Sequence, residues 1–337
     1  MESAATLGRA WGRRRVLVTG AAGFIGSWLV KELLSLGAHV VALVMDEDPQ
    51  SEFFRSGDWR RATVVNGRLQ DSSALQRAVN VHETDTVFHL AAQTLVGPAW
   101  RAPWETFESN IRGTYNLLEV CRLHPGLVKR IVVASSDKAY GGQPGLPYRE
   151  TMPLEGRQPY EVSKSCADLL AQSYFHSYRL PVAIARCGNV YGGGDLNWSR
   201  IVPGTIRSLW RGERPVIRSD GSLLRDYVYV KDVVNAYLLL AENLGRRNVA
   251  GESFNFGLNK PMTVLAVVTA ISRLMGLSRL KPDIRKSARG EIASQYLCAQ
   301  KARRALKWRP AYELEAGLQE TIAWYQGTFK AGACRHD

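Results

Sequence analysis

The stretch from Arg15 to Gly37 reads RVLVTGAAGFIGSWLVKELLSLG, and it decides the fold of the first half of the chain. A short β-branched run ends in a turn where Gly20, Gly23 and Gly26 are three residues apart, and a longer amphipathic run follows. A plain turn would also explain three glycines. Between a strand and a helix, however, they let backbone amides approach a pyrophosphate at the helix N-terminus, where the helix dipole favours negative charge. The stretch therefore predicts a dinucleotide-binding unit.

The next apolar run, HVVALVMD, ends in an acid, Asp46, which stands twenty residues after Gly26. In dinucleotide-binding units, a carboxylate at the end of the second strand accepts hydrogen bonds from the adenosine ribose. The same carboxylate repels a 2′-phosphate by its charge. Asp46 therefore predicts NAD as the cofactor and argues against NADP.

Outward from this unit, short β-branched runs alternate with longer amphipathic stretches, and this alternation is typical of parallel βαβ units. After about Asp195 the pattern becomes irregular, with Trp, Pro and Arg mixed through it. We expect an α/β protein in which a doubly wound parallel sheet, a Rossmann fold, is followed by a smaller C-terminal lobe that binds the substrate. The expected boundaries are a disordered leader over 1–12, a cofactor-binding domain over 13–188, and a second lobe over 189–330 with some segments returning to the first domain.

Composition excludes several classes of protein. No apolar run approaches the roughly 20 residues of a membrane helix, and the start of the chain lacks the apolar core of a secretory signal. The formal charge of +13 is spread along the chain without a nucleic-acid-binding motif, so we expect a small phosphorylated substrate and neither nucleic acid nor a membrane. The five cysteines and six histidines form no disulfide or metal-binding pattern, which favours the reducing cytoplasm and predicts no metal site.

A second chemical motif is YEVSK, in which Tyr160 and Lys164 are four residues apart and so share one face of a predicted helix. Such a pair occurs by chance in many helices. Here it follows a nucleotide-binding half and a strand that ends in Ser135 and Ser136. A neighbouring ammonium and a bound nicotinamide cation stabilise a phenolate, so we expect a lowered pKa for Tyr160, which would make it a general base.

The stretch ASSDKAYG, residues 134–141, places an acid and an amine side by side at the end of the same strand. Asp137 and Lys138 could form a solvated turn. Alternatively, they could transfer protons in an elimination, which needs an acid and a base in addition to the tyrosine. An ammonium cannot accept a proton, so Lys138 can be the base only where its surroundings favour the neutral amine.

These motifs resemble those of the extended short-chain dehydrogenase/reductases, in the NAD-dependent epimerase/dehydratase branch that acts on sugar nucleotides. The resemblance runs from about Arg14 to Tyr325 and rests on TGAAGFIG, FHLAAQ, SNIRGTYNLLE, SSDKAYG, PYEVSKSCAD, RCGNVYGGGD, RDYVYVKD and LKWRP. Within the family, AAQTLV, SDKAY and GNVYGGGD are most similar to the CDP-glucose 4,6-dehydratases. RDYVYVKDVVNAY instead follows the wider epimerase/dehydratase pattern.

The resemblance implies a role for each motif. Ser136 and Tyr160 would hydrogen-bond the sugar 4-hydroxyl, Tyr160 would remove its proton, and Lys164 would hold the nicotinamide ribose. Asp137 and Lys138 would share the elimination of water. The cofactor would be held by Gly20, Gly23, Phe24, Ile25, Gly26, Asp46, Ala91, Tyr160 and Lys164. The nucleoside-diphosphate sugar would contact Gln93, Asn189, Arg225 and Arg289.

The loop GRLQD departs from the family's Gly-Asp-x-x-Asp pattern, because Arg68 replaces the first acid. The adenine contact of that acid is therefore not expected of Arg68, and the contact by Asp71 stays open. His89, at a strand end near the cofactor, is expected to be a hydrogen-bonded structural histidine. Three arginines of the second lobe are expected to be solvated surface residues: Arg207, Arg211 and Arg218.

Three functions stay open on the sequence. The expected activity is NAD-dependent 4,6-dehydration of a nucleoside-diphosphate hexose. The first alternative is an epimerase of the same fold, which also oxidises C4 but needs no Asp–Lys pair. The second is a non-catalytic NAD-binding regulator, against which Tyr160 and Lys164 argue, because a binding module has no use for a phenolate. By resemblance, we expect a homodimer formed through first-domain helices that include SKSCADLLAQSYF.

Overall fold

The computed structural model describes residues 11–287 and 291–333, and its largest element is a seven-stranded sheet. The strands lie in the order β11-β6-β5-β4-β1-β2-β3, and every neighbouring pair is parallel. The chain winds from β1 outward to β3 and then from β4 outward to β6, so the sheet is doubly wound as predicted. Its strands are β1 (Arg15–Thr19), β2 (His39–Val44), β3 (Thr63–Asn66), β4 (Thr86–His89), β5 (Arg130–Ala134), β6 (Val182–Cys187) and β11 (Ser253–Phe256).

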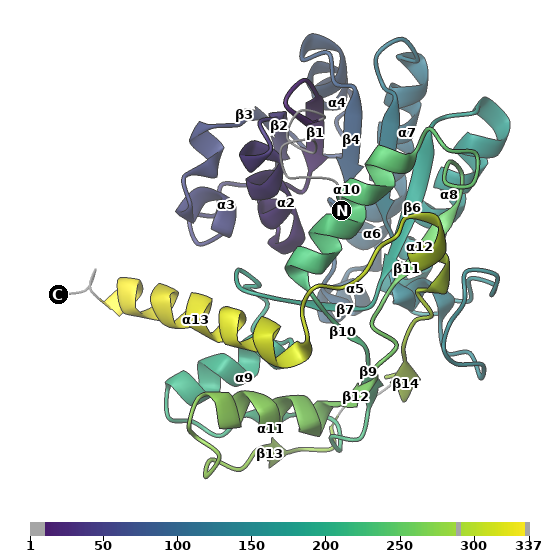
Figure 1. Cartoon of the computed structure of the whole chain (residues 1–337). Coiled ribbons are helices and arrows are strands. Elements are labelled where there is room, and N and C mark those ends of the chain that lie inside the picture. The colour runs from purple at the N-terminus through teal and green to yellow at the C-terminus, as the bar shows by residue number, and fades with distance from the viewer. Residues whose placement is uncertain (1–10, 288–290, 334–337) are drawn as a thin grey trace.

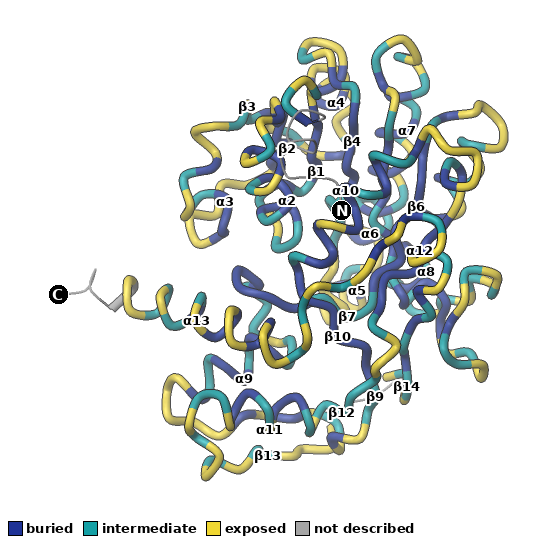
Figure 2. Tube along the Cα trace, in the orientation of Figure 1, coloured by how far each residue is buried: buried dark blue, intermediate teal, exposed yellow. Residues whose placement is uncertain are grey.

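Helices cover both faces of this sheet, and the strands between them are buried (Figure 1, Figure 2). Alternate side chains of β1 enter different apolar cores: Val16 and Val18 face one, and Leu17 faces the other. The first core packs under α2 (Phe24–Ser35) and α10 (Val230–Asn243). The second packs under α4 (Ser72–Gln76), α7 (Gly113–Leu123) and α8 (Pro159–Tyr178). The first domain also contains the short helices α3 (Glu52–Arg55), α5 (Val96–Arg101) and α6 (Pro103–Phe107). Its short 3-10 and π-helical segments are η1 (Asp58–Arg60), η2 (Arg77–Val81), η3 (Glu108–Arg112) and η4 (Asp137–Tyr140).

The smaller lobe lies below the sheet in Figure 1 and comes mainly from the later part of the chain. Its helices α9 (Ile201–Trp210), α11 (Val264–Leu274) and α13 (Leu314–Ala333) pack around a third apolar core. Helix α10, strand β11 and helix α12 (Gln300–Ala305) instead return to the first domain. The short strands of this part are β7 (Asn189–Tyr191), β8 (Val216–Ile217), β9 (Leu224–Arg225), β10 (Tyr227–Tyr229), β12 (Met262–Thr263), β13 (Asp283–Ile284) and β14 (Ser294–Gln295).

The N-terminal boundary of the folded body includes Trp11. Residues 1–10 of the expected leader lie outside the described residues, whereas Trp11 is fully buried. Its ring lies 6.1 Å from that of Phe88, and its Nε1 donates a hydrogen bond of 2.6 Å to Glu242. The first domain therefore begins by Trp11, before the predicted boundary at residue 13.

A buried polar network ties helix α8 to strand β6 and to turn η4. Arg186 donates to both carboxylate oxygens of Asp168, at 2.8 and 2.9 Å, and to the hydroxyl of Tyr140, at 2.8 Å. Tyr140 donates in turn to Asn255 of β11 at 2.8 Å. The side chains of the ion pair are 3% and 0% exposed, so neither charge is compensated by water. The network fixes the helix of the Tyr–Lys motif and the turn of the Asp–Lys pair against one sheet edge.

We expect Asp168→Asn to lower the free energy of unfolding by about 3–5 kcal/mol, because it leaves the buried Arg186 charge without its counter-charge. Denaturation in urea, followed by circular dichroism, measures the change. Glu313→Gln is the matched control, since Glu313 forms an exposed pair with Lys260, and it should change the unfolding free energy by less than about 1 kcal/mol. Equal effects of the two substitutions would contradict the importance of the buried pair.

Candidate functional site

A cleft of about 1730 Å³ lies at the carboxyl ends of the sheet strands and reaches into the second lobe. This is where doubly wound sheets place their ligands. Every predicted site residue within the described ranges lines the cleft, whereas Arg289 lies outside those ranges. The lining residues from the prediction are Gly20, Gly23, Phe24, Ile25, Gly26, Asp46, Ala91, Gln93, Ser136, Asp137, Lys138, Tyr160, Lys164, Asn189 and Arg225.

Gly20 and Gly26, at the turn between β1 and α2, have no room for a Cβ atom. Gly20 has a φ of 71°, and a Cβ added to it would lie 2.8 Å from the backbone nitrogen of Ala91. A Cβ on Gly26 would lie only 2.0 Å from the carbonyl oxygen of Gly20. Helix α2 starts after Gly23 without a side-chain cap and without an acid in its first turn. A helix start of this kind, close to the strand and free of acidic side chains, fits the pyrophosphate of a dinucleotide.

Both signs of charge occur where the cleft passes the ends of β2 and β3. Asp46 is exposed just beyond β2, and Arg68 lines the cleft beyond β3. Asp71 instead caps helix α4, where its Oδ1 accepts hydrogen bonds from the backbone nitrogens of Ser73 and Ala74 at 2.9 and 3.2 Å. Asp71 is therefore the N-cap of helix α4, whereas Arg68 lines the cleft.

His89 is a structural residue, as predicted. Its ring nitrogens lie 2.9 Å from the hydroxyls of Thr19 and Thr114, so both have partners. Burial lowers the pKa of His89 to about 3, and the imidazole therefore stays neutral. It joins the end of β1 to helix α7 beneath the cofactor turn.

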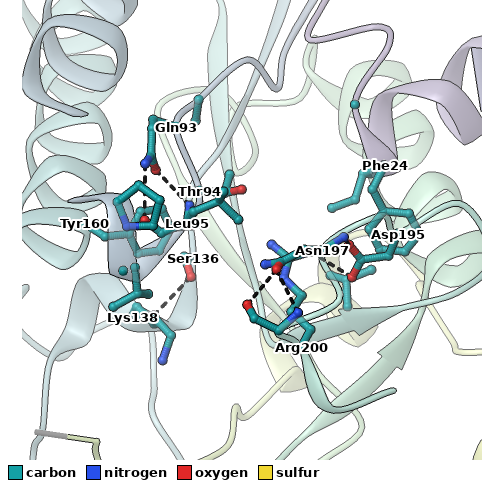
Figure 3. Close-up of a pocket in the computed structure, with 18 of the residues that line it drawn as sticks. Phe24, Gln93, Thr94, Leu95, Ser136, Lys138, Tyr160, Asp195, Asn197 and Arg200 are labelled. Carbon is teal, nitrogen blue, oxygen red and sulfur yellow. Dashed lines mark hydrogen bonds and ion pairs between the residues drawn. The ribbon is translucent and has the colours of Figure 1, made fainter. Parts of the chain in front are cut away.

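Ser136, Lys138 and Tyr160 lie together on one wall of the cleft, with Gln93 beside them (Figure 3), and Asp137 and Lys164 also line the cleft. Ser136 donates a hydrogen bond of 3.1 Å to Asp137 and accepts one of 3.2 Å from the backbone nitrogen of Lys138. Lys138 donates to Oε1 of Gln295 at 3.0 Å. The arrangement brings a phenol, a hydroxyl, a carboxyl and an amine to one place.

Burial controls the protonation of the Tyr–Lys pair. It raises the pKa of Tyr160 to about 12, although the Arg200 charge acts in the opposite direction. It also lowers the pKa of Lys164 to about 8, and the Lys164 amine donates to the carbonyl oxygen of Ala134 at 2.8 Å. Among the protein's own groups, desolvation of the Tyr160 phenol therefore outweighs the charge of Arg200, and the predicted lowering of its pKa depends on the nicotinamide cation.

Asp137 is only 3% exposed, and burial raises the pKa of its carboxyl despite the opposing charges of Lys138 and Arg225. Its Oδ2 has no hydrogen-bond partner among the described residues. A buried carboxyl of this kind is protonated more readily than an exposed one and can donate a proton to a ligand.

The opposite wall comes from the second lobe and carries polar groups that the sequence analysis partly missed. Nδ2 of Asn189 is buried and has no partner within the described part of the chain. The Arg225 guanidinium donates to the carbonyl oxygens of Leu224 and Ala293 at 2.8 and 3.3 Å and lies 3.5 Å from Glu291. Asn189 on β7 and Arg225 on β9, which were predicted to contact the substrate, thus line the cleft.

Three further arginines line this wall: Arg200, Arg207 and Arg218. Arg200 pairs with Asp195 at 3.0 Å, as Figure 3 shows, and Arg207 stacks over the ring of Trp198 at 4.7 Å. Arg211 and Arg218 are exposed, as predicted, although Arg218 also lines the cleft, whereas Arg207 is only partly exposed because it packs on Trp198. The irregular sequence of this lobe offers no periodicity from which their direction could be inferred.

Within residues 11–287 and 291–333, no cluster of three or more His, Cys, Asp or Glu side chains has the arrangement to hold a metal ion. In the same ranges, no helix combines the length and the apolar character required to cross a bilayer.

The sequence model of the NAD dependent epimerase/dehydratase family matches residues 16–257, which include the glycine turn, the Asp–Lys pair and the Tyr–Lys motif. The chain belongs to this family. NAD is accordingly its cofactor, and the glycine turn and helix α2 supply a site that fits it.

Members of this family that resemble the chain catalyse two different reactions. CDP-glucose 4,6-dehydratase of Salmonella typhimurium is 31% identical over 94% of this chain and 91% of that protein. UDP-glucose 4-epimerase of Halalkalibacterium halodurans is also 31% identical, over 92% of this chain and 95% of its own length. The relatives support an enzyme that acts on sugar nucleotides, and both dehydratases and epimerases occur among them.

Solved structures give the same division. UDP-glucose 4-epimerase of Thermotoga maritima has a TM-score of 0.85 at 29% identity, covering 94% of this chain and 99% of that one. dTDP-glucose 4,6-dehydratase of Streptomyces venezuelae, solved with NAD bound, has a TM-score of 0.85 at 28% identity, covering 94% and 98%. The fold is therefore shared by both reactions and does not distinguish them.

We expect the purified protein to release NAD on denaturation, and Asp46→Asn to weaken the preference for NAD over NADP by about 10-fold or more, because the repulsion of a 2′-phosphate is removed. Chromatography of the released nucleotide and competition between the two cofactors measure this preference. Glu47→Gln removes the same charge from a neighbour outside the cleft lining and should leave the preference unchanged. Release of mostly NADP from the wild type would contradict the assignment to Asp46.

Proposed function

We propose that the protein is a nucleoside-diphosphate-hexose 4,6-dehydratase that acts on a CDP-glucose-like substrate with NAD as cofactor. The observation that supports this most is the pair Asp137 and Lys138, which lines the cleft beside Ser136 and Tyr160. Epimerisation at C4 needs one group that takes and returns the hydroxyl proton. Dehydration also breaks C5–H and C6–O, and so it needs a further base and a further acid.

The first step is oxidation at C4 of the sugar. Tyr160, together with Ser136, binds the 4-hydroxyl and removes its proton. NAD held at the glycine turn would supply the acceptor for the C4 hydride and the hydride that C6 later receives. Tyr160 must first lose its own proton, which the charge of Arg200 and the cationic nicotinamide favour. Lys164 holds the nicotinamide ribose.

The second step is the elimination of water. The keto group at C4 makes the C5 proton acidic, and the neutral amine of Lys138 takes it. The C6–O bond breaks as Asp137 gives its proton to the departing 6-hydroxyl, so that water leaves and a C5–C6 double bond forms. Burial of Asp137 supports this role, because it favours the protonated carboxyl before the reaction. Hydride addition at C6 and return of the proton to C5 give the 4-keto-6-deoxy sugar.

The second lobe binds the nucleoside diphosphate in this proposal. Asn189, with its unpartnered amide nitrogen, and Arg225 contact the substrate together with Gln93. The arginines of the opposite wall attract the two phosphates by charge. Arg289 is proposed for the same role on the resemblance alone.

A second candidate function is a nucleotide-sugar 4-epimerase. The equal identity of 31% to a UDP-glucose 4-epimerase favours it. In that case Asp137 and Lys138 would serve only the shape of turn η4.

A homodimer is proposed through the outer faces of α7 and α8, which pack side by side on the first domain. Large apolar side chains are exposed on both helices: Tyr115, Leu123, Leu169 and Tyr178. We expect light scattering to give the mass of two chains and Leu169→Glu to give that of one, because a charge in a buried interface is costly. Leu265→Glu on α11 is the control and should leave the dimer intact. A wild type with the mass of one chain would overturn the proposal.

The decisive test of the function is incubation with a panel of CDP-, UDP- and dTDP-hexoses in heavy water, followed by mass analysis. The wild type should lose one water and incorporate deuterium at C5. Asp137→Asn should still form a 4-keto hexose but lose water about 10²–10⁴-fold more slowly, because the acid is missing. Tyr160→Phe should block formation of the 4-keto hexose itself. A wild type that inverts C4 without water loss or C5 exchange, and an Asp137→Asn variant that matches it, would establish the epimerase instead.

A further inference from the structure

Gln295 reaches Lys138 from the second lobe, 157 positions away in the sequence. Its Oε1 accepts a hydrogen bond of 3.0 Å from the lysine Nζ. Gln295 is fully buried and is not among the residues that line the cleft. Its amide oxygen thus contacts a residue of the cleft wall, Lys138, from behind that wall.

The backbone around Gln295 is held from two sides. In strand β14 it pairs with Arg225 of β9. On the other side, the backbone nitrogen of Tyr148 donates to the carbonyl oxygen of Tyr296, and the nitrogen of Cys298 donates to that of Tyr148, both at 2.9 Å. The amide oxygen of Gln295 is therefore a fixed acceptor, whereas the lysine amine lies at the end of a flexible chain.

An uncharged hydrogen-bond acceptor, such as the amide oxygen of Gln295, is suited to a lysine that gains and loses a proton. Both an ammonium and a neutral amine can donate a hydrogen bond to an amide oxygen, so Gln295 holds Lys138 before and after it takes a proton. A carboxylate in the same place would form an ion pair and favour the ammonium alone. Two ionisable neighbours act at the same place: Asp137, which is buried on the same turn and is the acid of the proposed function, and Arg225 of β9, whose charge also acts on Asp137.

We propose that Gln295 is a positioning residue that fixes Lys138 for proton transfer at C5 of the sugar. This role rests on the proposed dehydratase function. It also gives the second lobe a part in the chemistry, because the neighbouring residue in register, Arg225, is a proposed ligand of the substrate.

The test compares three variants of the NAD-bound enzyme on the best substrate of the panel. Gln295→Leu should slow C5 deuterium exchange and water loss about 10- to 100-fold, the worth of a hydrogen bond to a charged group, with KM and the rate of 4-keto hexose formation unchanged. Gln295→Glu should slow exchange at neutral pH and move the rising limb of its pH–rate profile to higher pH, because the paired ammonium must first lose its proton. Ser294→Ala is the matched control, since adjacent residues of a strand face opposite sides, and it should behave as the wild type.

Thermal denaturation of each variant checks that the fold is retained. Should Gln295→Leu fail to fold, Gln295→Glu, which keeps the size of the side chain, carries the test through its pH profile. A wild type that dehydrates the substrate, with C5 exchange unchanged in Gln295→Leu or a pH profile unchanged in Gln295→Glu, overturns the positioning role alone. Equal slowing of 4-keto hexose formation in Gln295→Leu also overturns it, because the effect is then not specific to C5. A wild type without C5 exchange or water loss overturns the dehydratase function and this role together.

Discussion

The bidentate ion pair between Arg186 and Asp168 connects the parts of the chain on which the chemistry of the cleft depends. Each charge is buried, so each requires the other, and neither α8 nor β6 can shift without separating them. Through the hydroxyl of Tyr140 the same guanidinium also holds turn η4. The phenol of Tyr160 lies on α8 and the carboxyl of Asp137 lies on η4. This network fixes the position of α8 relative to η4. The polar groups that meet at the cleft wall are positioned from behind it.

Local sequence patterns were sufficient for the parts of the site that lie within one strand, turn or helix. Gly20 and Gly26 are separated by one turn, and Tyr160 and Lys164 by one helical turn, so spacing alone places each pair correctly. Gln295 could not be found in this way, because its partner is distant in sequence and its strand has only two residues. The burial that raises the pKa of Tyr160 could not be inferred from a local pattern either, for a related reason. Its pKa depends on how completely other segments exclude water, and no short stretch of sequence records that exclusion.

The comparison with relatives shows what the fold leaves undecided. The proteins similar to this chain include both dehydratases and epimerases, and the shared fold does not separate the two reactions. In the proposed function, the groups that distinguish them are Asp137 and Lys138, which follow Ser136 on η4. The family assignment therefore rests on most of the chain, whereas the reaction rests on two side chains and the residues that orient them.

Strand β11 has a consequence for the synthesis of the protein. It completes the sheet beside β6, yet residues 253–256 follow β6 only after the whole of α9 and α10. While the chain leaves the ribosome, strands β1 to β6 are available to pair long before β11 is. During that interval the outer edge of β6 has unpaired backbone groups, which can pair with strands of other chains. Asn255, the β11 partner of Tyr140, is also missing until then. The edge of β6 is therefore a site where the nascent chain can aggregate until β11 has been made.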